Sequence, residues 1–300
     1  MSEFTELKIT STHGYEIPVL SSADAGSREI LLCLHGFAGG KRSPVIAGVA
    51  GAVKGDGIGV VTFDWPAHGE SPAPDGALTV RNCLEDLSTI YAAVRERGLP
   101  VSCFATSFGG YLATLWRGER PDAFRKLILR SPALKMAEVY GRFLTDAQKA
   151  ALAGGEAVTV GFDRRMTLGP AFCEGLRQHD AFSPAAPSPE DILILQGDRD
   201  DVVLPQDTAA YAERNGIRVE WFRGSDHRYR QDGDRERIAQ TARAFLLGLA
   251  HAGSSIGAGL EDLIQDIRRD GIRLIAAAAA ALDEGFQGFV HDITSLCLHM

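Results

Sequence analysis

The sequence is poor in cysteine and carries no excess of positive charge. Its 300 residues include five cysteines and no C-x-x-C pair. This count argues against a disulfide framework, and Cys33 and Cys103 fall inside apolar runs that are typical of buried strands. We therefore expect a reduced, cytoplasmic chain. The 39 acidic and 31 basic side chains give a net charge of −8, which disfavours nucleic acid as a partner.

Targeting segments, membrane spans and metal motifs are also missing from the pattern. The opening residues, MSEFTELKIT, show no basic stretch followed by an apolar one, so we expect no secretory signal. The longest apolar stretch, Ile272 to Leu282, is shorter than the roughly 20 residues that a spanning helix needs and contains Arg273. No H-x-x-x-H, H-E-x-x-H or clustered Cys/His spacing occurs. We expect no membrane contact, no metal and no other cofactor.

What the sequence does contain is an alternation of strand and helix patterns. With 45% hydrophobic residues, the chain is long enough to bury a large core. Apolar runs of strand length alternate with segments of helical period, which predicts an α/β fold with a mostly parallel twisted sheet. Two short strands, Leu7–Thr10 and Glu16–Leu20, are expected to form an antiparallel opening. Six buried strands are expected at Glu29–Leu34, Gly59–Phe63, Val101–Ala105, Lys126–Leu129, Asp191–Leu195 and Arg218–Phe222.

Two helices are predicted from their capping residues and apolar spacing. Thr79 is expected to cap a helix that ends before Gly98-Leu99-Pro100. Its inward positions are predicted to be Val80, Leu84, Leu87, Tyr91 and Val94. A second helix is expected from about Asp234 to Ala250.

Composition predicts three parts. Residues 1–132 and 190–252 are expected to form the α/β core. Residues 133–189, which hold several aromatic residues and are broken by Gly and Pro pairs, are expected to form an inserted, mainly helical cap. Residues 253–300 begin with a Ser/Gly-rich joint and are expected to form a helical extension. Because its polar face carries both signs of charge, we expect this extension to dock on the body or to form a homodimer contact, and not to bind a membrane.

Ser107 lies in the pattern of a nucleophile elbow. The strand Val101–Ala105 leads directly into Thr106-Ser107-Phe108-Gly109-Gly110 and then into a helical segment. A sharp turn between strand and helix lifts the serine hydroxyl above the edge of the sheet, where a base can take its proton. Ser107 is therefore a candidate nucleophile.

An acid and a histidine follow later strands in the order that such a nucleophile requires. Asp200 comes just after the strand that ends at Leu195, and His227 lies in the loop after the last strand. The carboxyl ends of parallel strands meet at one edge of the sheet, so both side chains are expected near Ser107. Asp198, Asp201 and Asp226 compete with Asp200 for the acid role.

These motifs resemble those of the α/β-hydrolase family over roughly Leu7 to Ala250. The further matches are His35-Gly36-Phe37, which looks like an oxyanion loop; Asp64-Trp65-Pro66-Ala67-His68-Gly69-Glu70-Ser71, similar to the D-x-x-G-x-G-x-S turn; Gly197-x-x-Asp200-x-x-Val203; and Gly224-x-x-His227. The chain departs from the family pattern at Ala105 and Ala67, where glycine is commoner. Alanine is the next smallest residue, so we expect both turns to form.

The resemblance implies a serine hydrolase that cleaves a small or medium carboxylic ester through an acyl-serine intermediate. It implies Ser107 as the nucleophile, His227 as the general base and Asp200 as the carboxylate that orients the imidazole. The backbone N–H groups of Phe37 and Phe108 would form the oxyanion hole. A narrower likeness is to bacterial acyl and cinnamoyl esterases. A thioesterase, a serine peptidase and a non-catalytic ligand-binding protein of the same fold remain alternatives.

Other residues in these motifs are expected to be structural. His35 and His68 each belong to a turn in which an imidazole can satisfy buried backbone groups. Aromatic residues of the cap, namely Tyr140, Phe143, Phe162 and Phe172, together with Met166, are expected to pack more often than to contact a ligand.

Overall fold

The structure is a computed structural model that describes residues 4–161 and 164–249. The predicted C-terminal extension, residues 253–300, lies outside the described residues, as does Phe162. The expected homodimer contact through that extension therefore stays a prediction. No helix within the described ranges is long and apolar enough to cross a membrane.

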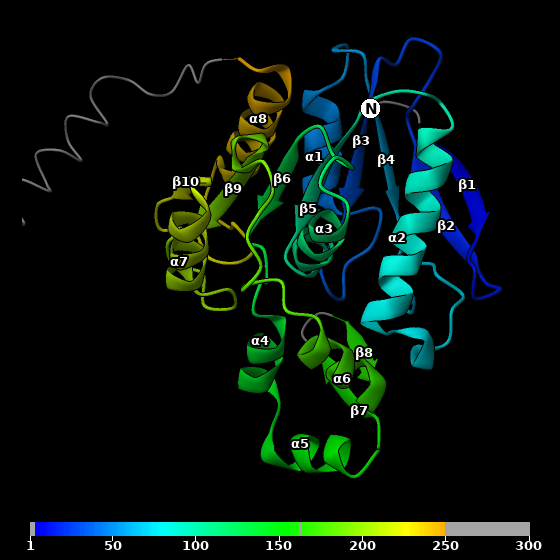
Figure 1. Cartoon of the computed structure of the whole chain (residues 1–300), viewed down its shortest axis with the longest axis vertical. Coiled ribbons are helices and arrows are strands. Elements are labelled where there is room, and N and C mark those ends of the chain that lie inside the picture. Colours follow the sequence, from blue (N-terminus) through cyan, green and yellow to red (C-terminus); the bar gives the residue numbers. More distant parts are fainter. Residues whose placement is uncertain (1–3, 162–163, 250–300) are drawn as a thin grey trace, which may run out of the picture. The chain divides into compact units, whose positions relative to one another are not determined.

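Eight strands form one sheet in the order β1-β2-β4-β3-β5-β6-β9-β10 (Figure 1). The strands are β1 (Thr5–Thr10), β2 (Glu16–Ser21), β3 (Glu29–Leu34), β4 (Ile58–Phe63), β5 (Val101–Thr106), β6 (Leu127–Arg130), β9 (Ile192–Gly197) and β10 (Arg218–Phe222). The pairs β1–β2 and β2–β4 are antiparallel, and the remaining neighbours are parallel. The predicted fold class is confirmed, including the antiparallel opening.

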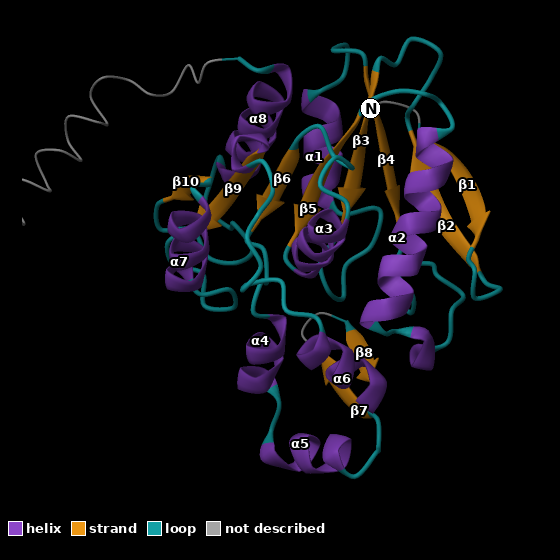
Figure 2. Ribbon diagram, viewed as in Figure 1, coloured by secondary structure: helices purple, strands orange, loops and turns teal. Residues whose placement is uncertain are grey.

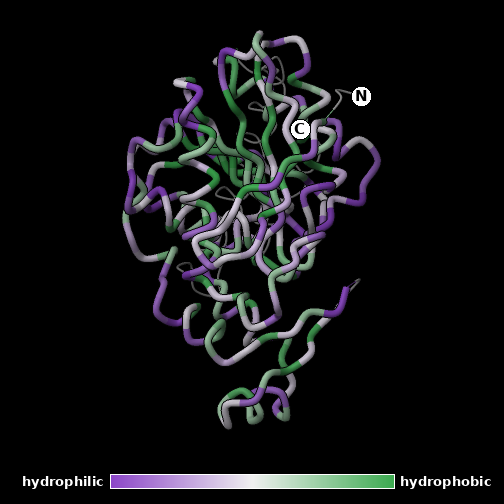
Figure 3. The backbone as a smooth tube through the Cα atoms, turned by 90° about the vertical axis from the view of Figure 1, so that its right-hand side faces the viewer, coloured by the Kyte–Doolittle hydropathy of each residue, from purple (hydrophilic) through white to green (hydrophobic). Residues whose placement is uncertain are grey.

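Helices cover both faces of this sheet, which explains why its central strands are apolar runs without alternation. Helices α1 (Pro44–Ala52) and α8 (Asp234–Leu247) pack on one face, with Leu31 and Cys33 of β3. Helices α2 (Val80–Arg95), α3 (Phe108–Glu119) and α7 (Pro205–Asn215) pack on the other, with Ile30 and Leu32. Figure 2 shows these layers, and Figure 3 shows the hydrophobic strands between more polar loops.

Helix α2 begins as predicted, but its buried stripe is rotated. Thr79 accepts a hydrogen bond from the backbone N–H of Asn82 at 3.0 Å. Leu84 and Tyr91 are only half-buried, whereas Asp86 is fully buried. Asp86 faces inward because Ser11 and Tyr15 donate hydrogen bonds to its carboxylate at 2.5 and 2.7 Å. A polar contact made across the fold therefore displaces part of the apolar stripe.

The chain between β6 and β9 contains a hairpin that the sequence patterns did not predict. The helices of this segment are α4 (Met136–Phe143), α5 (Asp146–Ala153) and α6 (Pro170–Gln178), and its hairpin strands are β7 (Val158–Gly161) and β8 (Arg165–Leu168). A short 3-10 turn at Pro189–Asp191 precedes β9, and another, at Asp75–Ala77, precedes α2. Tyr140, Met166 and Phe172 are buried, while Phe143 is 41% exposed. Most of the apolar residues expected to pack in this segment do so.

Candidate active site

Ser107 lies in the sharp turn between β5 and α3. Its backbone has φ 50° and ψ −113°, a conformation that non-glycine residues rarely adopt. The turn is possible because strand and helix approach closely at Gly109, where a methyl group would lie 2.7 Å from the carbonyl oxygens of Leu34 and His35. Ala105, one departure from the family pattern, is fully buried there. The local fold thus presents the Ser107 side chain beyond the end of β5.

The structure brings Ser107, His227 and Asp200 into one chain of hydrogen bonds. Nε2 of His227 is 3.1 Å from Oγ of Ser107, and Nδ1 of His227 is 2.8 Å from Oδ2 of Asp200. A carboxylate can only accept, so the proton lies on Nδ1 and Nε2 is left to accept the Ser107 hydroxyl proton. This is the arrangement that converts a serine hydroxyl into a nucleophile.

Asp200 is held in place by its own loop and by the end of β9. The residue is 2% exposed, and its Oδ1 accepts the backbone N–H groups of Val202 and Val203 at 3.0 and 2.8 Å. Burial raises the pKa of Asp200, but the hydrogen bond and charge of His227 and the Val203 N–H outweigh burial, so the pKa lies below its usual value. Gln196 also donates to Oδ2, at 3.2 Å. Sequence reasoning missed Gln196, although a glutamine closing the apolar run of β9 could have indicated it.

The other carboxylates near this loop lie elsewhere. Oδ1 of Asp198 accepts the backbone N–H of Gly224, and Asp226 pairs with Arg230 at 2.6 Å. Asp201 is exposed. Of the four candidates, only Asp200 has a hydrogen bond to His227 among the described residues.

The two predicted oxyanion donors lie beside the nucleophile. Phe108 is the first residue of α3, and the rings of Phe37 and Phe108 have centroids 6.0 Å apart. A methyl group on Gly36 would lie 3.3 Å from Cβ of Ser107. Within the described chain, neither the Phe37 nor the Phe108 backbone N–H donates to another protein group. Two unpaired donors next to Ser107 can bind a developing oxyanion.

A buried ion pair links the oxyanion loop to the turn after β4. The Lys41 backbone N–H donates to Oδ1 of Asp64 at 2.6 Å, and its ammonium donates to Oδ2 at 2.9 Å. The Glu70 N–H donates to Oδ2 at 2.9 Å. Asp64 fills the space beside Gly69 (φ 54°), where a methyl group would lie 2.1 Å from Oδ1. This packing explains the Asp and Gly of the D-x-x-G-x-G-x-S turn. Sequence reasoning did not identify Lys41.

Lys41→Met is expected to destabilise the protein by about 3 kcal/mol, because it leaves the Asp64 carboxylate buried without its cation. The free energy of unfolding, measured in urea, tests this. Arg42→Met is the matched control: Arg42 follows Lys41 on the same loop, but its side chain is 56% exposed in pairs with Glu6 and Glu70. A surface pair contributes little, so the control should unfold close to wild type. Equal losses in both variants would contradict the prediction.

His35 and His68 make the structural contacts that were expected. Nδ1 of His35 donates to the carbonyl of Gly36 at 2.8 Å, and its Nε2 accepts the Trp65 N–H at 3.3 Å. Nδ1 of His68 donates to the carbonyl of Pro66 at 2.8 Å. Burial lowers the pKa of His35 to about 4 and that of His68 to about 3. Both imidazoles are therefore neutral in the folded protein near neutral pH.

These low pKa values predict that stability falls as the solution is acidified below pH 6.5. From there down to about pH 4, the unfolded chain binds protons at both histidines while the folded chain does not. Each histidine then costs up to about 1.4 kcal/mol per pH unit. His68→Gln should make the decline shallower between pH 6.5 and 5, and should run parallel to wild type between pH 7 and 8.5. Equal slopes below pH 6.5 would contradict the prediction. Urea unfolding at each pH gives the measurement.

Aromatic side chains from the cap segment pack against the oxyanion loop. The ring of Phe37 lies 5.1 Å from Tyr140 and 6.1 Å from Phe172, measured between centroids. It also lies 5.2 Å from His68. Phe37 thus connects the cap segment to the loop whose N–H lies beside Ser107.

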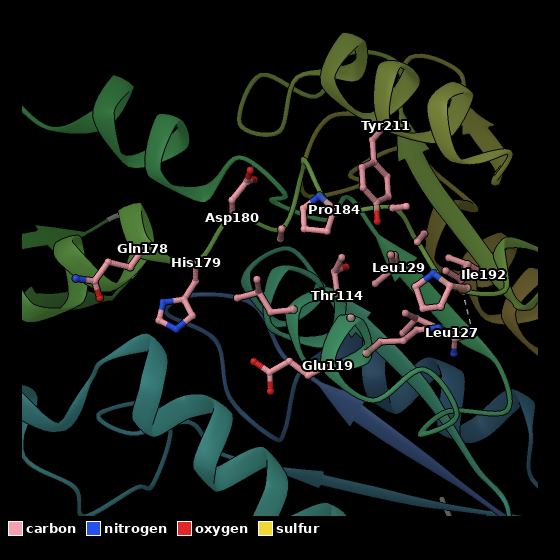
Figure 4. Close-up of a pocket in the computed structure, with 17 residues that line it drawn as sticks. Thr114, Glu119, Leu127, Leu129, Gln178, His179, Asp180, Pro184, Ile192 and Tyr211 are labelled. Carbon is pink, nitrogen blue, oxygen red and sulfur yellow. Dashed lines mark hydrogen bonds between the residues drawn. The ribbon is translucent and has the colours of Figure 1, made fainter.

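A cavity of about 310 Å³ lies beside α3 and the chain that follows α6. Figure 4 shows it between α3, which contributes Thr114 and Glu119, the chain after α6, which contributes Asp180 and Pro184, and Tyr211 of α7. Ser107, Asp200 and His227 are not among its lining residues. A carbonyl attacked by Ser107 must lie within reach of its Oγ, so this cavity is distinct from the reaction centre. Within residues 4–161 and 164–249, no cluster of three or more His, Cys, Asp or Glu could hold a metal.

The strand order, the covering helices and the elbow at Ser107 define an α/β-hydrolase fold. A family model described as serine aminopeptidase, S33 (Hydrolase_4) matches residues 25–162. This range includes Phe37, Ser107 and Phe108 but ends before Asp200 and His227. No curated protein matches the sequence. The predicted resemblance to α/β hydrolases is confirmed.

Solved structures with the same fold are distant in sequence. Est1E from Butyrivibrio proteoclasticus, solved with ferulic acid bound, is 16% identical, has a TM-score of 0.68, and covers 81% of this chain and 98% of its own. The mouse alpha/beta hydrolase domain-containing protein 10 is 18% identical with a TM-score of 0.69, covering 82% and 100%. The esterase EaEST from Exiguobacterium antarcticum is 18% identical with a TM-score of 0.56, covering 81% and 99%. At these identities the likeness shows the fold alone.

Proposed function

We propose that this protein is a serine hydrolase that cleaves a small or medium carboxylic ester. The observation that carries the proposal is the continuous hydrogen-bond chain from Ser107 through His227 to Asp200, with distances of 3.1 and 2.8 Å. A serine, an imidazole and a buried carboxylate in this order are the elements of nucleophilic acyl transfer. The two unpaired N–H groups beside Ser107 supply the remaining element.

In the proposed mechanism, Oγ of Ser107 attacks the ester carbonyl while Nε2 of His227 takes its proton. Asp200 stabilises the imidazolium, and the N–H groups of Phe37 and Phe108 bind the oxyanion. The carbonyl then re-forms as the C–O bond to the alcohol breaks, and His227 gives its proton to the departing alcohol. Water, deprotonated by His227, attacks the acyl-serine in the same way. The acid is released and Ser107 regains its proton.

The proposed preference for esters is supported by the fold neighbours and by the aromatic surroundings. EaEST is named as an esterase, and Est1E was solved with ferulic acid. The half-buried ring of Phe37 lies next to the turn that carries Ser107 and packs on the fully buried rings of Phe108 and Phe172. A partly exposed aromatic ring at this position suits an apolar acyl group. The description of the matching family model favours a serine peptidase as the second candidate, because both reactions use the same acyl-enzyme chemistry.

The test is to react the purified protein with a fluorophosphonate probe and with p-nitrophenyl esters from acetyl to long acyl. We expect labelling at Ser107, turnover of the esters, and an optimum at one acyl length that measures the space around the serine. Labelling without ester turnover would favour a peptidase or thioesterase, which peptide and thioester substrates would then distinguish. A folded protein that is neither labelled nor active would contradict the proposal and favour a ligand-binding protein.

A further inference from the structure

Two adjacent residues at the end of β6 contact Ser107 and the loop that carries His227. The carbonyl oxygen of Arg130 accepts the backbone N–H of Ser107 at 2.9 Å. The guanidinium of Arg130 donates from Nη2 to the backbone carbonyl of His227 at 3.0 Å. The hydroxyl of Ser131 lies 3.1 Å from the hydroxyl of Tyr229 in the same loop. Contacts with the nucleophile and with the His227 loop thus meet in one dipeptide.

The order of the strands explains this convergence. β6 lies between β5, which leads to Ser107, and β9, which leads to Asp200, with Arg130 paired to Thr106 on one side and to Leu195 on the other. Beyond the strand, the chain turns sharply at Ser131, whose φ is 42°. The Ser131 N–H donates to the carbonyl of Leu195 at 2.8 Å. The turn therefore places the Ser131 hydroxyl beside Tyr229 of the His227 loop.

Arg130 is a buried cation without a carboxylate partner within the described residues. Its residue exposure is 9%, and its guanidinium carbon lies 4.1 Å from the centre of the Tyr229 ring. Asp200 and Asp226 attract this charge from a distance, and Arg235 repels it. Burying an unpaired cation costs free energy, which the ring and the His227 carbonyl offset in part. A residue that served only to fill space would not need this charge.

Tyr229 extends the same contact network. Its hydroxyl donates to the carbonyl of Leu195 at 3.0 Å and lies 3.1 Å from Oγ of Ser131. Its backbone has φ 52°, two residues after His227, so the loop that carries the imidazole turns sharply above the Arg130 side chain. Arg130 therefore holds this loop from two directions, through the His227 carbonyl and through the Tyr229 ring.

We propose that Arg130 and Ser131 are positioning residues for the loop that carries His227. The proposal rests on the proposed function of Ser107, His227 and Asp200. Neither side chain touches the reacting atoms. Arg130 keeps Nε2 of His227 within reach of Ser107 Oγ, and Ser131 holds the same loop through its contact with the Tyr229 hydroxyl. A displacement of about 1 Å between reacting groups can cost a hundredfold in rate.

The structure offers a matched control for Arg130. Arg117 is 2% exposed, has no carboxylate partner within the described part of the chain, and donates from Nη1 to the carbonyl of Phe124 at 2.8 Å. Both arginines are thus buried cations bound to backbone carbonyls, but Arg117 lies near the end of α3, away from Ser107. Arg117→Met measures what the loss of such a cation does to the protein as a whole.

The experiment compares Arg130→Met, Arg130→Lys, Ser131→Ala and Arg117→Met with wild type. Three quantities are measured for each: kcat and KM on a p-nitrophenyl ester, the rate of fluorophosphonate labelling, and the proton NMR signal of the Nδ1–H that His227 donates to Asp200. For Arg130→Met we expect kcat and the labelling rate to fall together by up to about a hundredfold, with KM nearly unchanged. Arg130→Lys should regain part of the loss. Ser131→Ala should lower kcat about tenfold.

The control decides the outcome. Arg117→Met should keep the kcat, labelling rate and Nδ1–H signal of wild type, whereas the signal should broaden in Arg130→Met and Ser131→Ala. If Arg130→Met does not fold, Arg130→Lys serves in its place and should still fall below Arg117→Met. An Arg130 variant that reacts as fast as Arg117→Met would overturn the proposal. If wild type is neither labelled nor active, the proposed function fails instead, and the Nδ1–H signal alone then decides whether Arg130 positions His227.

Discussion

Ser107→Ala is expected to lower kcat on p-nitrophenyl esters by about a million-fold, to near the limit of detection. The substitution removes the oxygen that lies 3.1 Å from Nε2 of His227, and leaves His227 and Asp200 in place. Residual turnover would come from water attacking an ester bound at the N–H groups of Phe37 and Phe108. Removing the nucleophile also abolishes labelling by a fluorophosphonate. Initial rates and mass spectrometry of the labelled protein give the two measurements.

The control for this prediction is Ser88→Ala, the same substitution at a half-buried position on α2. It should retain wild-type turnover and labelling. Ser107→Ala should also unfold no more easily than wild type, because alanine replaces a serine whose side chain makes no N-cap hydrogen bond. Ester turnover that survives Ser107→Ala would place the nucleophile elsewhere, and Ser131, which is fully buried at the end of β6, would then be the next serine to replace.

Much of the fold was predictable because its information is local. The strands β3 and β10 have the predicted bounds, and the other strands of the eight-stranded sheet differ from prediction by one or two residues at an end. Burial on both faces makes each of the central strands a continuous apolar run, which is visible without knowing what covers it. The elbow was predictable for the same reason, since strand, small residues and serine are contiguous around Ser107.

The convergence of Ser107, Asp200 and His227 followed from one topological rule and not from local pattern. Parallel strands place the loops after their carboxyl ends at one edge, so three residues separated by up to 120 positions could be expected together. The rule says which loops meet but not which side chain of a loop is directed inward. Asp200, and not Asp198 or Asp201, is directed at His227 because the backbone N–H groups of Val202 and Val203 donate to its carboxylate.

The contacts that hold the site could not be predicted because they depend on pairing across the sheet. Arg130 looks like an ordinary charged residue at the end of a strand, and Lys41 like a solvent-exposed residue of a Gly-rich loop. Both side chains can be buried because each binds a polar group from another part of the fold: Arg130 donates to the His227 carbonyl, and Lys41 donates to the Asp64 carboxylate. The hairpin β7–β8 could not be predicted either, because its four-residue strands are too short to show a recognisable periodicity.

Asp200→Asn is expected to lower kcat by about 10⁴-fold while leaving the protein folded. Oδ1 of Asp200 accepts the N–H groups of Val202 and Val203, so the carbonyl oxygen of asparagine must take that position. The amide NH₂ then takes the position of Oδ2 and faces Nδ1 of His227. Because this NH₂ can only donate, Nδ1 must accept, and the imidazole proton moves to Nε2. His227 then has no lone pair for the Ser107 proton.

The neighbouring residue Asp201 provides the control for this prediction. Asp201→Asn makes the same chemical change one residue away, on an exposed side chain, and should leave kcat unchanged. Asp200→Asn should lose most activity near neutral pH and regain part of it at high pH, where hydroxide can deprotonate Ser107 without a base. A uniform loss at every pH would indicate a displaced loop, and full activity would exclude Asp200 as the partner of His227.

Gln196 supplies a second amide group at the same position, because its NH₂ donates to Oδ2 of Asp200 at 3.2 Å. Two amide donors would then face each other in Asp200→Asn, while the Gln196 NH₂ keeps its hydrogen bonds to the carbonyl oxygens of Gly197 and Val203, both at 3.2 Å.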